Sequence, residues 1–299
     1  MENLRGALLM VAAMAAFAVE DALIKALSMV LPTGQVMLVF SAGGALAFAG
    51  LMKARGLAIL SADLLDWRVV LRAACEFVGG LSFILAFTLG DLSTASAILQ
   101  ATPLAVVAGA ALLLGERVGW RRWSAVGIGF LGVMIVIRPG MAGFDPVSLL
   151  AVVSFVALAV RDLLTRRMPL SVSSLLLSTS AYAAMVPGAL LVLLLQQRPM
   201  AWPDGWEWIG LIAMVPMGML AYVLILGATR IGEISVIAPF RFSRIVFALI
   251  LAAIFFGERP DAWTYIGAGI IVASSGYAIW RERAAARRRA ASLPPQGKV

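Results

Sequence analysis

The 299-residue sequence contains no histidine and a single cysteine, and only 13% of its residues are charged. Histidine is the commonest general base and metal ligand, so its absence removes the usual routes to acid–base and metal chemistry. One cysteine, Cys75, excludes an intrachain disulfide, and its apolar surroundings in the sequence favour a packing role. The chain also lacks a Gly-x-Ser-x-Gly elbow, a zinc-protease motif and a Walker loop. We therefore expect a protein that is not an enzyme and has no cofactor or bound metal.

Charge is low because 62% of the residues are apolar, with a mean hydropathy of +0.97. A soluble domain carries roughly 25% charged residues, so water is not the main solvent of this chain. The net charge of +8 would favour nucleic acid in a soluble protein, but here Lys and Arg lie in short gaps between apolar runs. The expected partners are membrane lipids and a small-molecule substrate, with no nucleic acid and no obligate protein partner.

Apolar runs of about 20 residues, enough to cross the hydrocarbon core of a bilayer, recur along the whole chain. They predict an all-α integral membrane protein with ten transmembrane helices, the first of which is retained rather than cleaved as a signal peptide. The expected spans lie near residues 6–27, 33–52, 69–89, 93–114, 119–137, 146–165, 172–195, 207–229, 234–256 and 261–280.

The loop charges predict the orientation. With the N-terminus in the cytoplasm, most Lys and Arg residues between spans are cytoplasmic, and only Arg138, Arg198 and Arg259 lie outside. All eight tryptophans fall at or near span ends, where interfacial rings belong. We expect a multi-pass protein of a bacterial-type inner membrane with both termini cytoplasmic.

Short motifs recur with an offset of 142 residues. Gly115-Glu116-Arg117 recurs as Gly257-Glu258-Arg259, and Gly90-Asp91-Leu92-Ser93 recurs as Gly232-Glu233-Ile234-Ser235. Each half holds five spans, an odd number, so the second half enters the membrane from the opposite side.

This pattern predicts two inverted-topology five-helix repeats around a central cavity, an architecture typical of transporters that work by alternating access. The expected segments are a first repeat at 1–140, a second at 143–283 and a disordered basic cytoplasmic tail at 284–299.

Ten spans in two halves, an acidic residue late in the first helix of each half and the paired helix ends LLLGER and IFFGER resemble the EamA-type members of the drug/metabolite transporter superfamily. Within it, the chain is similar in size and organisation to the YddG-like aromatic amino acid exporters. The resemblance covers residues 1–283 and implies a basket of ten helices around a central cavity, with uncoupled or proton-linked export of amino acids or related metabolites.

Ionisable residues inside spans are functional candidates because their burial is costly. Arg72, Arg161 and Lys25 lie near span ends, where long side chains reach water. Asp21 with Lys25, and Arg72 with Glu76, stand at the i,i+4 spacing of helix ion pairs.

These assignments leave four ionisable residues inside spans as functional candidates: Glu20, Asp162, Arg241 and Arg244. Glu20 and Asp162 are equivalent in the two repeats, and they are the candidates for proton coupling because the chain has no histidine. Arg241 and Arg244 share one helix face without an acid on their own helix, so a substrate anion or an acid on another helix must face them. We expect Arg244 to lie nearest a substrate carboxylate, with Glu20 and Asp162 satisfying both arginines in the resting protein.

The corresponding part of the fourth span contains Gln100, Thr102 and Pro103, and Pro239 precedes the arginines in the ninth. A proline frees a backbone carbonyl, which predicts either a helix break at the substrate site or a simple kink. The candidate substrate-binding residues are Arg244, Arg241, Glu20, Asp162, Gln100, Thr102, Glu76, Phe77 and Tyr222.

We expect a transporter that exports small organic metabolites, chiefly amino acids including aromatic ones. An exporter of nucleosides or cationic drugs and a channel-like uniporter remain alternatives. A channel would need a continuous polar path, whereas the ionisable residues gather around the centre of the spans.

Overall fold

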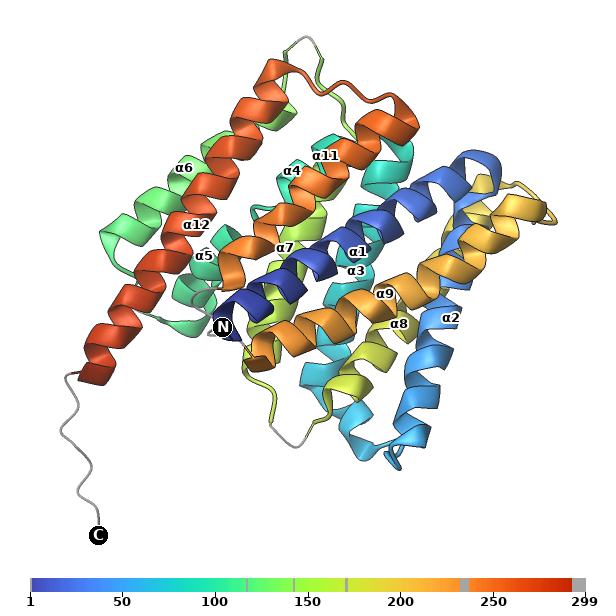
Figure 1. Ribbon diagram of the computed structural model, residues 1–299, viewed down its shortest axis with the longest axis horizontal. Coiled ribbons are helices and arrows are strands. Elements are labelled where there is room, and N and C mark those ends of the chain that lie inside the picture. The colour runs from blue at the N-terminus through green and yellow to red at the C-terminus, as the bar shows by residue number, and fades with distance from the viewer. Residues whose placement is uncertain (1, 117, 142, 170–171, 232–236, 292–299) are drawn as a thin grey trace.

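The computed structural model describes residues 2–116, 118–141, 143–169, 172–231 and 237–291, and across them the chain is helical and contains no strand (Figure 1). Ten helical segments in these residues are long and apolar enough to cross a membrane, and they coincide with the ten predicted spans. The first half contains α1 Glu2–Val30, α2 Thr33–Ala54, the short η1 Ala62–Leu65, α3 Trp67–Leu89, α4 Leu92–Leu99, α5 Thr102–Leu114 and α6 Trp120–Ile137. The second contains α7 Ser148–Arg166, α8 Ser174–Gln196, α9 Gly205–Ile231, η2 Ala238–Phe242, α11 Ser243–Phe256 and α12 Ala262–Ala291.

The fourth span is broken rather than kinked. Its first piece, α4, ends at Leu99, and α5 starts at Thr102 with Pro103 in its first turn, where a missing N–H does no harm. The Thr102 hydroxyl donates to the carbonyl of Leu99 at 2.6 Å. In the ninth span, Pro239 lies in η2 and the α-helix begins only at Ser243.

The main contacts between helices of the two halves have counterparts in which the equivalent helices have changed places. The offset of 142 residues pairs α1 with α7 and α3 with α9, and accordingly α1 packs on α9 while α3 packs on α7. Equivalent helices also meet directly, α2 on α8 and α6 on α12 (Figure 1). Exchanging the two halves therefore reproduces these helix contacts, as expected for halves related by a two-fold axis.

Small residues allow these helices to approach closely. A Cβ at Gly34 of α2 would lie 2.3 Å from the backbone nitrogen of Leu193 in α8. A Cβ at Gly132 of α6 would lie 2.9 Å from the carbonyl oxygen of Gly267 in α12. Glycine is therefore required at both contacts.

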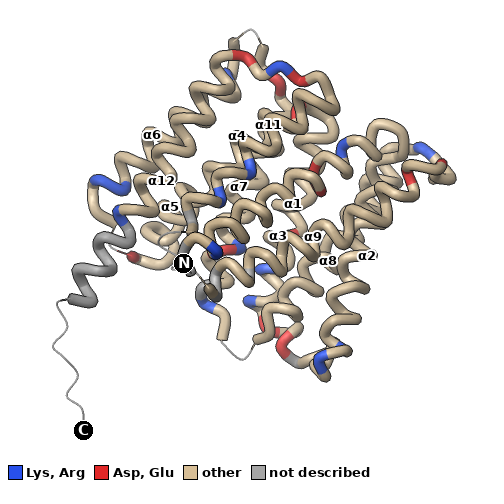
Figure 2. The backbone as a smooth tube through the Cα atoms, viewed as in Figure 1, with Lys and Arg blue, Asp and Glu red and all other residues tan. Residues whose placement is uncertain are grey.

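We name the two ends of the bundle after the repeated acidic motif. The Glu116 end contains the starts of α1, α3 and α6, and the Glu258 end contains the last turns of α1 and α11. Charged residues gather at both ends, and a smaller set lies along the helices between them (Figure 2).

At the Glu116 end, α12 continues to Ala291, past the point where the sequence predicted a disordered tail. The run Ala284-Ala285-Ala286 explains this extension, because alanine has the highest helix propensity. Residues 292–299 of the predicted tail lie outside the described residues.

Candidate substrate site

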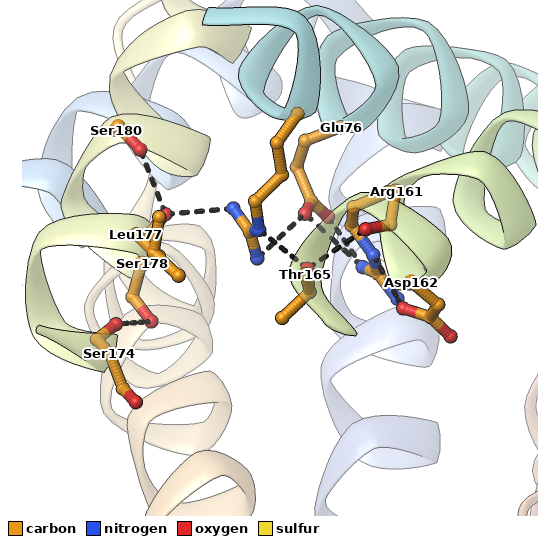
Figure 3. Close-up of polar contacts among 9 residues, drawn as sticks. Glu76, Arg161, Asp162, Thr165, Ser174, Leu177, Ser178 and Ser180 are labelled. Carbon is orange, nitrogen blue, oxygen red and sulfur yellow. Dashed lines mark hydrogen bonds and ion pairs between the residues drawn. The ribbon is translucent and has the colours of Figure 1, made fainter. Parts of the chain in front are cut away.

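Four charged side chains of α3 and α7 form one cluster near the Glu116 end, which we call the α3–α7 charge cluster: Arg72, Glu76, Arg161 and Asp162. Arg161 is its centre, and Figure 3 shows its guanidinium between the two carboxylates. Arg161 Nη1 lies 2.9 Å from Glu76 Oε1, and Arg161 Nη2 lies 2.7 Å from Asp162 Oδ1.

Arg72 completes the cluster from the first turns of α3. Its Nη2 lies 3.7 Å from Glu76 Oε2, which confirms the predicted i,i+4 pair. Its Nε donates to Thr165 Oγ1 at 3.0 Å, and its Nη1 donates to the carbonyl of Leu177 at 3.1 Å. These bonds tie α3 to α7 and α8, and the carbonyl and hydroxyl that accept them are drawn in Figure 3.

The cluster forms because α3 and α7 approach closely at a glycine. A Cβ at Gly79 would lie 2.8 Å from the side chain of Leu158. Within the cluster the exposed fraction of the side chain is 12% for Arg72, 17% for Glu76, 25% for Arg161 and 39% for Asp162. Asp162 is therefore the member most accessible to a solute.

Arg161 and Arg72 were predicted to reach water at span ends, but their side chains are only 25% and 12% exposed. Both are held by acids and hydrogen-bond acceptors of neighbouring helices. The sequence contained one signal for this outcome, because Arg161 lies at the same depth as Glu76 of another span. Ion pairing between helices depends on which helices pack together, and the spacing of residues along one helix does not show this packing.

Arg244, in the first turn of α11, pairs with Asp21 of α1. Its Nη2 lies 2.7 Å from Asp21 Oδ2, and the guanidinium stacks over Phe17 and Phe83 with centroid distances of 5.0 and 5.4 Å. Of the two acids predicted to satisfy the arginines, Glu20 and Asp162, neither forms an ion pair with Arg244 among the described residues. Residues 20 and 21 point about 100° apart on a helix, and it is residue 21 that faces α11.

Lys25 was predicted to pair with Asp21 and instead bonds Glu258 Oε1 at 2.7 Å. Its side chain is almost fully buried, so it does not reach water as the sequence indicated. Asp21 is thereby left for Arg244, which explains why both predictions failed together.

Glu20 faces α9 and is buried, with 4% of its surface exposed. Its Oε1 has no hydrogen-bond partner among the described residues. The carboxyl occupies the space beside Gly218, where an added Cβ would lie 2.2 Å from Oε1. Burial of an oxygen without a hydrogen bond disfavours a charge on this group. Glu20 therefore differs from its repeat equivalent Asp162, which is paired with Arg161 and partly exposed.

Arg241 is exposed in η2 and lies within electrostatic range of Asp162 and Arg161. The structure therefore separates the two arginines that the sequence placed together. Arg241 belongs beside the α3–α7 charge cluster, and Arg244 belongs to the ion pair with Asp21. Arg241 lies in η2, whereas Arg244 lies in the first turn of α11.

The other candidate residues have structural contacts. Gln100 is buried at the α4–α5 break, and its carbonyl accepts a hydrogen bond from Ser275 at 3.2 Å, so α12 satisfies a group that the break frees. Phe77 packs over Gly188 of α8. Tyr222 meets Phe48 edge-on at 5.3 Å and lies within electrostatic range of Arg72. Of these residues, only Tyr222 adjoins the charge cluster.

The chain belongs to the EamA-like transporter family, whose model matches residues 4–138 and 146–279. The two matched segments correspond to the two five-helix halves, and the class is therefore a multi-pass membrane transporter of small metabolites.

Three relatives illustrate the range of substrates that this family carries. The chain is 27% identical over 220 residues to an S-adenosylmethionine uptake transporter of Rickettsia felis, covering 74% of each chain. It is 29% identical over 201 residues to a riboflavin transporter of Vibrio cholerae, covering 64% of each. It is 25% identical over 281 residues to the pseudopaline exporter CntI of Pseudomonas aeruginosa, covering 89% of this chain and 93% of that one. These relatives are not named for aromatic amino acid export, so the narrower likeness indicated by the sequence is corrected.

A solved crystal structure shares the fold, with a TM-score of 0.60 at 20% sequence identity over 95% of this chain and 99% of that one. At this identity the match establishes the arrangement of helices and no more.

Proposed function

We propose that this protein carries a zwitterionic, amino-acid-type metabolite across the membrane by alternating access, with the α3–α7 charge cluster as its first binding site. The observation that carries the proposal is the presence of both charge signs in one partly exposed cluster, with Arg241 beside it. A free amino acid group presents a carboxylate and an ammonium, and each finds a complementary partner there.

In this proposal the substrate exchanges partners with the cluster. Its carboxylate binds Arg161 and Arg241, and its ammonium binds Asp162, whose side chain is the most exposed of the four. Glu76 keeps Arg161 in place during the exchange because it contacts Arg161 through both oxygens, at 2.9 and 3.2 Å. The Arg244–Asp21 pair lies deeper and offers the same combination of charges at the next step.

S-adenosylmethionine is the first substrate to test. Relatives named as uptake transporters for it are 27–28% identical to this chain, and the molecule carries an α-amino acid group. Its adenine also requires an aromatic surface, which Tyr222 and Phe48 provide next to Arg72. Amino acids, riboflavin, nucleosides and cationic drugs complete the panel as competing substrate classes.

The test is transport by purified protein in sealed proteoliposomes, with each solute loaded inside or outside so that both directions are measured. We expect uptake or exchange of S-adenosylmethionine or a free amino acid, weakened in Asp162→Asn and kept in the control Glu207→Gln. Glu207 lies in the first turn of α9, away from the cluster, and its carboxylate accepts a hydrogen bond from the backbone N–H of Asp204. Transport of a nucleoside or simple cation alone, unaffected by Asp162→Asn, would contradict the proposal.

We further propose that the Glu116 end faces the cytoplasm of a bacterial-type inner membrane. The loop charges support this orientation, because Lys53, Arg55, Arg68 and Arg121 all lie at that end.

A further inference from the structure

Glu258 joins the two halves of the chain at one end of the bundle. It follows α11, in the second half, and its carboxylate accepts four hydrogen bonds from the first half: from Lys25 Nζ at 2.7 Å, from the backbone N–H of Leu92 at 2.9 Å, and from both the backbone N–H and the hydroxyl of Ser93 at 2.9 and 2.6 Å. Lys25 also donates to the carbonyl of Gly90 at 2.7 Å. We call these five residues the Glu258 latch.

Three favourable interactions act together in the Glu258 latch. An ion pair with side chains only 10% and 8% exposed is little screened by solvent. The two backbone N–H groups are unpaired donors at the start of α4, where a carboxylate also meets the positive end of the helix dipole. These contacts hold α1, α4 and α11 together, so separating the halves at this end requires breaking all of them.

The sequence repeat supplies an equivalent pair at the opposite end. With the offset of 142 residues, Lys25 corresponds to Arg167 and Glu258 corresponds to Glu116. Charge signs are conserved in both exchanges, so the same ion pair is available between the two halves at the Glu116 end. Ile234 and Ser235, which correspond to Leu92 and Ser93, lie outside the described residues.

At the Glu116 end this pair is apart. Glu116 and Arg167 are both exposed, and no ion pair joins these two described side chains. The same asymmetry holds for the acids of the first helix in each half. Glu20 is 4% exposed, whereas the side chain of its equivalent Asp162 is 39% exposed.

We infer that Glu258–Lys25 and Glu116–Arg167 are alternating gates of the transport cycle, and that the structure has the first closed and the second open. The inference rests on the proposed transport function, but it concerns which side chains hold each end closed and does not depend on the substrate. Each conformation makes one ion pair and exposes the charges of the other, so the two conformations stay close in free energy and a bound solute can shift the balance between them.

The test measures the distance between α1 and α11 at the Glu258 end by pulsed electron spin resonance, in lipid nanodiscs without substrate. Spin labels are placed at Met29 and Phe255, whose side chains are exposed, in a Cys75→Ala background. Glu258→Gln removes the carboxylate charge and leaves Lys25 without this ion pair. We expect the population with the longer α1–α11 distance to rise by about tenfold relative to the short one.

Glu207→Gln is the matched control, because it makes the same chemical change at the start of α9 without joining the halves. Glu116→Gln weakens the opposite gate and should leave the short distance dominant, and the double variant Glu258→Gln/Glu116→Gln should fall between the single variants. Ser93→Ala, which removes one hydrogen bond from Glu258, is the milder variant if Glu258→Gln does not fold. Distance distributions for Glu258→Gln or Ser93→Ala that match Glu207→Gln would overturn the inference. Because no solute is present, that failure is distinguishable from a wrong substrate assignment.

Discussion

Arg161 is the side chain on which the α3–α7 charge cluster depends, because its guanidinium contacts both Glu76 and Asp162. Lysine keeps the charge but cannot donate to two carboxylates with a planar fork. We predict that Arg161→Lys raises the KM for the transported zwitterion by about tenfold, equivalent to about 1.4 kcal/mol. The measurement is the concentration dependence of uptake at matched protein amount, with Arg55→Lys at the exposed end of α2 as the control. An unchanged KM in Arg161→Lys would remove this residue from the site.

Glu20 is the candidate for proton coupling that the structure favours, because it is buried without a partner for Oε1. Glutamine has the same shape and no charge, so Glu20→Gln should unfold at a temperature no lower than wild type, whereas Glu76→Gln, which loses two ion pairs, should unfold at a lower one. We also predict that transport by wild type responds to a pH gradient and that transport by Glu20→Gln does not. Insensitivity of the wild type to the gradient would leave Glu20 as a structural residue.

The sequence predicted which residue types occupy the site better than it predicted their partners. It identified Glu20, Asp162, Arg241 and Arg244 as costly charges inside spans, and all four lie at helix–helix contacts or beside the charge cluster. It paired Arg244 wrongly, because a rotation of one residue on α1 decides whether an acid faces α9 or α11. Arg241 does lie within electrostatic range of the predicted Asp162.

At the scale of the element, close helix contacts at glycine set the spacing of the bundle. Gly34 lies against the backbone of Leu193, which cannot move aside as a flexible side chain can. We predict that Gly34→Ala destabilises the protein by about 1–3 kcal/mol through overpacking of α2 on α8. Gly269→Ala is the control, because a Cβ there meets open space and should stabilise α12 by about 0.5–1 kcal/mol. Thermal unfolding of both variants in detergent is the measurement, and equal midpoints would contradict the packing argument.

Helix existence was predictable because hydrocarbon thickness sets the length of apolar runs, and all ten spans were found in place. The break in the fourth span was less predictable from the sequence. Proline at 103 indicated either a kink or a break, and the choice depended on Thr102 and Ser275 supplying hydrogen bonds to Leu99 and Gln100. The second of these donors comes from α12, far along the chain, and no local pattern reveals it.

At the scale of the whole molecule, the Glu258 latch determines how the closed end responds to pH. Burial raises the pKa of Glu258, but hydrogen bonds from Lys25, Ser93 and Leu92 outweigh burial and hold it below its ordinary value. A lowered pKa means that the contribution of this carboxylate is complete above about pH 4.3, the ordinary value for glutamate, and is lost as the pH falls through the lower folded value. We predict that the Met29–Phe255 distance distribution is the same at pH 8 and pH 5.5. A shift to longer distances within that window would contradict the geometry of the latch.

Recognition of a zwitterion by the α3–α7 charge cluster can be measured by counterflow into proteoliposomes preloaded with unlabelled S-adenosylmethionine. Labelled S-adenosylmethionine is offered outside against two competitors, its decarboxylated form and its N-acetylated form, which each lack one charge of the amino acid group. We predict accumulation of label by wild type, weak competition by both analogues, and loss of the discrimination against the N-acetylated form in Asp162→Asn. Competition by either analogue as strong as that of S-adenosylmethionine itself, or discrimination unchanged in Asp162→Asn, would contradict this prediction.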